Sequence, residues 1–280
     1  MEPLNELIKK AHVLLNENRN AKYEITDEVH PRNRNLRRIR ALRDIRKHGV
    51  RAGDLGGYIE SEDNLAHEDD AWVSDDAQIS GDAHVSGNAS VSGNAEVSGR
   101  AMVNRNARVS GDTEVTDGAW VHGNAQISGD AKVYDKAEVQ AKAEVTDNAE
   151  VFGNALVWGD APLISGNAQV SGNVQISGRA EVSGGAMVNR NARVSGNAQI
   201  RDGAWVHGNA QISGNAQIRD KAEVQAKAEV TDNAVVSGNA LVWGDAPLIS
   251  GRAQVSGNAQ VSGKAVIDGN TKVTGNERIS

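Results

Sequence analysis

The chain has 280 residues and a net charge of -7; only 3% of its residues are aromatic, and it has a single Phe and 30 Gly. A globular core of ordinary thickness needs more large apolar side chains, so the composition favours a thin, repetitive core. Cysteine is absent, which excludes disulfides and cysteine-ligated metal sites. We find no apolar run of about 18 residues and no leader peptide, and we expect a cytoplasmic protein without a membrane segment, cofactor or metal.

Positive and negative charges are unevenly distributed along the chain. Residues 1–57 contain thirteen Lys and Arg against eight Asp and Glu, so the remainder carries about -12. A basic head on an acidic rod predicts two surfaces with different partners. What we call the basic patch consists of Arg37, Arg38, Arg40, Arg43, Arg46 and Lys47.

The N-terminal segment 1–57 is predicted to form a small α+β cap. Residues 3–18 place Leu and Ile at helical spacing, which predicts an amphipathic helix. Residues 22–26 and 36–42 look like paired strands, and the turn-rich stretch 51–59 leads into the first coil. Because the end of a solenoid exposes an unpaired strand edge, we expect this head to cap the first coil.

From Ala71 onward a six-residue unit of the form A-x-V-S-G-N recurs as 35 hexads. The Val or Ile of each hexad is predicted to point inward from a short strand, and its two neighbours outward. The Ala is a second inward residue, while Gly, Asn and Asp occupy a corner that favours positive φ. One hexad buries almost nothing alone, so this long, short-period repeat predicts a solenoid. The repeat slips by one residue at Pro162 and again at Pro247.

This hexad resembles the repeat of left-handed β-helix proteins with the trimeric LpxA-like fold. The resemblance implies three hexads per 18-residue triangular coil and a left-handed winding. At about 4.8 Å per coil, roughly eleven to twelve coils make a rod of about 55 Å. We therefore predict an all-β fold, a single-stranded left-handed parallel β-helix over residues 58–280, with the cap over 1–57.

The sequence contains an internal duplication that tests the coil length. Residues 101–166 recur at 186–251, and eleven of the 66 aligned positions differ. All eleven lie in the hexads centred on Val115, Val133 and Val151, which follow one another at intervals of three hexads. A coil of three hexads places these changes on one face of the rod and leaves two faces unchanged.

The segment VRAGDLGGYIE at residues 50–60, followed by Asn64-Leu65 and Asp70-Ala71-Trp72-Val73, resembles the YdcK-like hexapeptide-repeat proteins of bacteria and their phages. The resemblance covers residues 22–280 and leaves out the predicted helix at 3–18. It implies a left-handed β-helix and a bacterial or phage origin. It implies no particular activity.

Apolar and aromatic residues recur at outward positions beside the core Val. Ranks of exposed Trp and Met are typical of interaction surfaces, although the same residues can simply pack on one another along the rod. Glu138 and Glu223 interrupt the two sets. The two sets are fourteen hexads apart, which is four coils plus two hexads, so the second set is predicted to lie on a neighbouring face. The first ladder consists of Met102, Trp120, His122, Leu156 and Trp158, and the second ladder of Met187, Trp205, His207, Leu241 and Trp243.

Acyltransferase-like chemistry is an alternative that the hexapeptide-repeat resemblance brings with it. Such enzymes use a His near a subunit boundary and loops that leave the coil. Here the slips at Pro162 and Pro247 are the only interruptions, and His84, His122 and His207 are predicted to point outward with no carboxylate placed beside them. We find no nucleophile triad, phosphate loop or metal spacing, and we assign no catalytic residue.

The sequence therefore favours a non-enzymatic, phage- or prophage-derived β-solenoid that binds or scaffolds a protein, with host proteins among its candidate partners. Another alternative is an acidic DNA mimic that inhibits a nucleic-acid-binding enzyme. Nucleic acid itself is not the favoured partner, because no aromatic residues interleave with the basic patch. Since Ile279 occupies a core position, we expect the edge of the last coil to be covered by a second copy, giving a homo-oligomer, or by a partner.

Overall fold

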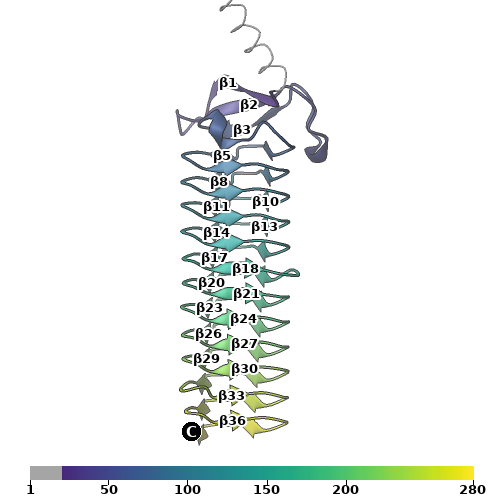
Figure 1. Ribbon diagram of the computed structural model, residues 1–280. Helices are drawn as coiled ribbons and strands as arrows, with labels where there is room; N and C mark the ends of the chain where they lie inside the picture. The colour runs from purple at the N-terminus through teal and green to yellow at the C-terminus, as the bar shows by residue number, and fades with distance from the viewer. Residues whose placement is uncertain (1–20) are drawn as a thin grey trace, which may run out of the picture.

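The computed structural model describes residues 21–280 as a straight rod with a small β head at one end (Figure 1). The helix predicted at 3–18 lies outside the described residues. Within residues 21–280, no helix has the length and apolarity needed to cross a membrane.

The head contains three strands, β1 (Tyr23–Val29), β2 (Arg37–Ala41) and β3 (Leu55–Ile59), and two short 3-10 helices, η1 (Arg46–His48) and η2 (Glu62–Asn64). β1 pairs with β2 and β2 with β3, both antiparallel, which confirms the predicted strand pair. Residues 51–59, predicted only as a turn-rich connection, also contain β3. β3 then pairs in parallel with β5 (Gln78–Ile79), so the head continues one sheet of the rod.

The rod is built from 35 short strands, β4 to β38, which form three parallel sheets. The head strands and the following strands form the 15-stranded sheet, face 1: β5, β8 (Glu96–Val97), β11 (Glu114–Val115), β14 (Lys132–Val133), β17 (Glu150–Val151), β20 (Gln169–Val170), β23 (Met187–Val188), β26 (Trp205–Val206), β29 (Glu223–Val224), β32 (Leu241–Val242), β35 (Gln260–Val261) and β38 (Arg278–Ile279). The 12-stranded sheet, face 2, contains β4 (Trp72–Val73), β7 (Ser90–Val91), β10 (Arg108–Val109), β13 (Gln126–Ile127), β16 (Glu144–Val145), β19 (Leu163–Ile164), β22 (Glu181–Val182), β25 (Gln199–Ile200), β28 (Gln217–Ile218), β31 (Val235–Val236), β34 (Gln254–Val255) and β37 (Lys272–Val273). The 11-stranded sheet, face 3, contains β6 (His84–Val85), β9 (Met102–Val103), β12 (Trp120–Val121), β15 (Glu138–Val139), β18 (Leu156–Trp158), β21 (Gln175–Ser177), β24 (Arg193–Val194), β27 (Gln211–Ile212), β30 (Glu229–Val230), β33 (Leu248–Ile249) and β36 (Val266–Ile267).

Each strand pairs with the strand three hexads away, so every coil lies directly over the next. Trp120 pairs with Met102 on one side and Glu138 on the other, and each partner belongs to an adjacent coil. This register confirms the predicted parallel β-helix with three hexads to a coil. The left-handed winding stays a prediction from the resemblance.

The core consists of stacked columns of Val or Ile and of Ala, which are buried except near the end of the rod, where Ala265 and Ile279 are partly buried. Between faces the chain turns at a residue of positive φ, such as Gly99 at 68° or Asp117 at 59°. Asp tolerates this conformation better than most residues and adds a contact there. At one such corner the Gly153 N–H donates to Asp135 Oδ2 of the preceding coil at 3.0 Å.

The extra residue at each slip of the repeat is accommodated in the turn at one corner of the coil. After Trp158, Gly159 and Ala161 adopt φ of 125° and 71°, and Pro162 enters the core at the position that Ala fills elsewhere. The strand register is kept, because Glu144 pairs with Leu163 and the extra residue bulges outside the sheet. The second slip, at Pro247, repeats this arrangement.

Corresponding hexads of the two duplicated segments lie on different faces. The three diverged hexads form β11, β14 and β17 on face 1, and their copies form β25, β28 and β31 on face 2. The eleven differences therefore follow one side of the rod in each copy.

Lys22 anchors the head to the first coil. Its side chain is fully buried, and Nζ donates to the Ala71 carbonyl at 2.6 Å. Beside it, the Tyr23 hydroxyl donates to the Leu65 carbonyl at 2.8 Å, and its ring stacks on His67. Burial, and secondarily the charge of Arg43, lower the pKa of Lys22 to about 8.

Thr113 provides a stability test because its hydroxyl is buried without a hydrogen-bond partner among the described residues. We expect Thr113→Val to raise the free energy of unfolding by about 1 kcal/mol, since an unsatisfied polar group is replaced by an isosteric apolar one. Val174 occupies the same inward position in another coil, so the shape fits. Denaturant unfolding measures the change.

The copy of Thr113 in the second segment is Ala198, and it supplies the control. Ala198→Thr should lower the free energy of unfolding, because it buries a hydroxyl in the same setting. Destabilisation by Thr113→Val would show that the hydroxyl has a partner.

Lys22 also predicts a dependence of stability on pH. Its pKa is lowered in the folded state, so between about pH 8 and 10 the unfolded chain binds more protons and stability rises with pH. Across this range the free energy of unfolding of the wild type should rise by about 2 kcal/mol more than that of Lys22→Met. Chemical unfolding at several pH values measures it, with Lys221→Met, an exposed lysine, as control. A flat difference between wild type and Lys22→Met would contradict the prediction.

Candidate functional site

The two predicted ladders lie on adjacent faces of the rod. The first ladder lies on face 3, where Met102, Trp120, Glu138 and Leu156 pair in succession. The second lies on face 1 in the same order, from Met187 to Leu241. Glu138 and Glu223 interrupt the two ladders as predicted.

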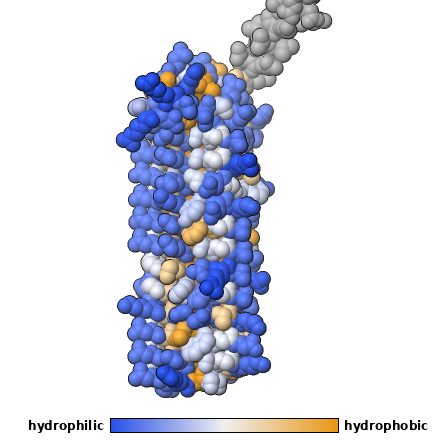
Figure 2. Space-filling view, turned by 90° about the vertical axis from the view of Figure 1, so that its left-hand side faces the viewer, coloured by the Kyte–Doolittle hydropathy of each residue, from blue (hydrophilic) through white to orange (hydrophobic). Residues whose placement is uncertain are grey.

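The ladders are only partly open to solvent. Met102, Met187 and Trp205 are exposed, at 41%, 37% and 36%. Trp120 and Trp158 are half-buried. Figure 2 shows how apolar side chains gather on such a rod: on the side in view, neutral and apolar residues form a narrow band between hydrophilic rows.

The two ladder histidines correct the sequence-based interpretation. His122 and His207 were expected to stand outward without a nearby carboxylate, but both are buried, at 5% and 7% exposure. His122 Nε2 lies 2.8 Å from Glu138 Oε1, and the ring stacks on Trp120 with centroids 4.1 Å apart. The second copy repeats this contact, at 2.9 Å, between His207 and Glu223.

His84, the third repeat histidine, lies close to a carbonyl and not to a carboxylate. Its Nδ1 is 2.6 Å from the backbone oxygen of Asp63, beside η2. It therefore contacts the segment that joins head and rod.

The His–Glu pairs have the distance of a general base and its orienting carboxylate, but the imidazole is not accessible. In each pair Nε2 faces the Glu, and Nδ1 is buried without a partner among the described residues. No imidazole nitrogen is left to meet a substrate, so the geometry favours a structural role, with Glu138 and Glu223 fixing the Trp–His stack. Within residues 21–280 no group of three His, Asp or Glu could hold a metal ion.

Face 1 carries two further aromatic residues that the sequence analysis did not include in a ladder. Tyr134 and Phe152 stack with centroids 4.8 Å apart, two coils before the second ladder begins. Their spacing of three hexads was the available signal. Their copies on face 2 are Arg219 and Ser237, so the stack exists once in the rod.

Three arginines of the basic patch contact other groups of the head and the first coil. Arg38 pairs with Glu28 and Asp76 and lies over the Tyr58 ring, and Arg40 pairs with Glu24. Arg43 donates to the Asp69 carbonyl at 3.1 Å. Much of the predicted positive charge is therefore used to hold the head together and to the rod.

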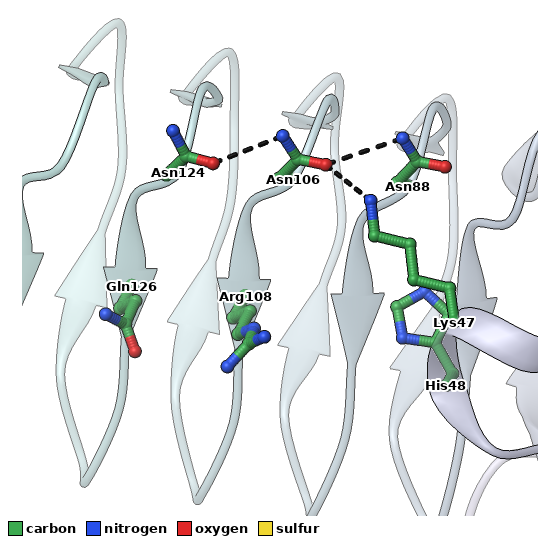
Figure 3. Close-up of a pocket in the computed structure, with 7 residues that line it drawn as sticks. All are labelled: Lys47, His48, Asn88, Asn106, Arg108, Asn124 and Gln126. Atoms are coloured by element: carbon green, nitrogen blue, oxygen red, sulfur yellow. Dashed lines mark hydrogen bonds between the residues drawn. The ribbon is translucent and has the colours of Figure 1, made fainter.

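Lys47, also in the basic patch, points away from those pairs and reaches the rod. Its Nζ donates to Asn106 Oδ1 at 2.6 Å, within a ladder of corner amides (Figure 3). Lys47 and His48 thereby form one wall of a cavity of about 430 Å³. The opposite wall belongs to the rod and consists of Asn88, Asn106, Arg108, Asn124 and Gln126.

The His122–Glu138 contact can be tested by a double-mutant cycle in which each residue is replaced by Ala. We expect a coupling free energy of about 1 kcal/mol, because the hydrogen bond is partly buried. The exposed Gln126–Glu144 pair on face 2, at 3.4 Å, is the control and should show almost no coupling. Strictly additive losses in the His122–Glu138 cycle would contradict this assignment.

Comparison with known proteins supports the repeat assignment. Residues 77–93 and 253–269 match the family model described as the YdcK beta solenoid repeat. A search of curated proteins gives no match. The matched segments lie near opposite ends of the rod, and the hexads between them have the same form. The chain is therefore a parallel β-solenoid with YdcK-type repeats, which confirms the resemblance to YdcK-like hexapeptide-repeat proteins.

Proposed function

We propose that this chain is a non-catalytic β-solenoid that binds a protein partner on its apolar ladders. One observation carries the proposal. Of the four large apolar side chains exposed on the rod, three belong to the ladders: Met102, Met187 and Trp205. Exposed Met and Trp gathered on an otherwise polar surface are typical of protein interfaces.

Face 1 offers the longer of the two surfaces. The Tyr134–Phe152 stack lies on the same face as the second ladder, so apolar side chains recur from β14 to β32. The first ladder on face 3 lacks this extension. We therefore place the principal contact on face 1.

The charge around this surface indicates the chemistry of the partner. The outward row of face 1 contains Glu96, Glu114, Glu150 and Glu223 against two cations. These are Lys132, which pairs with Glu114 at 2.9 Å, and Arg278 in the last strand. A complementary partner presents apolar side chains between Lys or Arg side chains. A second copy of this chain would bring like-charged rows together, so we favour a different, basic partner.

Acyl transfer is less well supported than protein binding. The ladder histidines have no accessible nitrogen, and the slips at Pro162 and Pro247 add one residue each, which is too short for a loop that covers an acyl donor. The YdcK-type repeats and the segment at residues 50–60 are the grounds for a bacterial or phage origin. On that basis we propose a host protein as the partner.

The proposal is tested with a short basic peptide of about twelve residues, built from Leu-Ser-Lys units, and a matched peptide with Glu in place of Lys. Isothermal titration calorimetry should show binding of the Lys peptide only. Changing Trp205 and Trp243 together to Ser should weaken binding about tenfold or more, since aromatic residues dominate such contacts.

Leu163→Ser is the matched control, because it also replaces a half-buried outward apolar residue by Ser, but on face 2. It should leave peptide affinity unchanged, and circular dichroism should show an intact fold for all variants. Absence of binding, equal binding of both peptides, or equal losses in Leu163→Ser and the Trp variant would overturn the proposal. Self-association that is lost in the Trp variant would replace the basic partner by a second copy.

A further inference from the structure

We propose that the cavity between the head and face 2 binds a small molecule that carries a phosphate monoester. This site is separate from the apolar ladders and does not depend on the proposed protein binding. The cavity forms where η1 of the head lies over the outward side of β7, β10 and β13.

Two cationic side chains line the cavity and no carboxylate does. Lys47 reaches over it from the head, and Arg108 projects from β10 of the rod (Figure 3). Arg108 makes no ion pair with any described residue, so its donors are open to a ligand. Two acidic residues lie close to lining residues without lining the cavity themselves: Asp70 interacts with His48, and Glu144 accepts from Gln126 one coil further on.

Neutral polar side chains complete the lining. Asn88 and Lys47 both donate to Asn106 Oδ1, and Asn106 in turn donates to Asn124 at 3.1 Å, which leaves the terminal Asn124 amide group at the edge of the cavity. His48 Nε2 is buried and has no partner among the described residues. Figure 3 shows His48 and Arg108 on opposite sides of the open space beneath Lys47.

A guanidinium and an ammonium on facing walls of one cavity recognise a phosphate group by charge-assisted hydrogen bonds. The cavity volume of about 430 Å³ is much larger than a phosphate ion and falls within the usual range for small-molecule sites. The organic part of a monoester can therefore lie in the cavity beside its phosphate.

The internal duplication provides a natural comparison for this site. The rod wall recurs as Asn191, Arg193, Asn209 and Gln211 of the second segment. Asn173, just before that segment, stands at the position of Asn88, and the Asn173–Asn191–Asn209 hydrogen bonds are the same. This second wall lies on face 3, far along the rod from the head, and has no counterpart of Lys47 and His48. Only the first copy can therefore form the two-sided cavity.

Phenyl phosphate is the probe, titrated into the full chain by isothermal titration calorimetry at constant ionic strength, with phenol as the uncharged comparison. We expect saturable binding of one phenyl phosphate per chain and none of phenol. Lys47→Gln and Arg108→Gln should each weaken binding about tenfold or more, because each removes a charge-assisted contact.

Arg193→Gln is the matched control: it removes the same side chain from the same repeat wall without the head. It should leave the affinity unchanged, and thermal unfolding should show that all variants are folded. The proposal is overturned if phenyl phosphate does not bind saturably, if phenol binds equally, or if Arg193→Gln weakens binding as much as Arg108→Gln. Failure of peptide binding to face 1 has no bearing on this result, so the two proposals fail separately.

Discussion

The hydrogen bonds between successive coils are the interaction on which the rod depends. A strand of two residues has no stability of its own, and each one gains it by donating to the coil that follows, as Gln78 N–H does to the Ala95 carbonyl at 2.9 Å. This ladder holds residue i over residue i+18. The backbone neighbours of each rod residue therefore follow from its position in the sequence, and the core Val and Ala residues stack in columns.

The same constraint explains how surfaces are distributed around the rod. A corner can admit one extra residue, as at Gly159 and Ala161, because the slip lies outside the hydrogen-bonded strands. The copies are fourteen hexads apart, and fourteen is not a multiple of three, so the duplication turned each surface onto a neighbouring face. The first ladder lies on face 3, away from Tyr134 and Phe152. Its copy, the second ladder, lies on face 1 together with these two residues.

Much of the fold could be predicted because the six-residue repeat, with three repeats to a coil, determines which residues stack on one another. The core columns, the slips and the faces of both ladders follow from counting residues. The His122–Glu138 contact was missed because it joins positions 16 residues apart, a diagonal across two coils that depends on side-chain rotamers. The Arg38 and Lys47 contacts could not be derived either, since they depend on how the head docks on the first coils.

A regular repeat offers the same environment in every coil. A site with a distinct environment therefore forms where the rod contacts the head, which is not part of the repeat. The wall around Arg108 and its copy around Arg193 have the same sequence, yet only the first faces Lys47 and His48. The stacked coils hold the rod wall of the cavity in place, and the head supplies the opposite wall. Lys22 lies at that junction, where its Nζ donates to the Ala71 carbonyl while burial lowers its pKa. The head is held to the rod by the β3–β5 pairing, the Tyr23 hydrogen bond to Leu65 and the Lys22 hydrogen bond to Ala71, and the cavity exists only while that docking lasts.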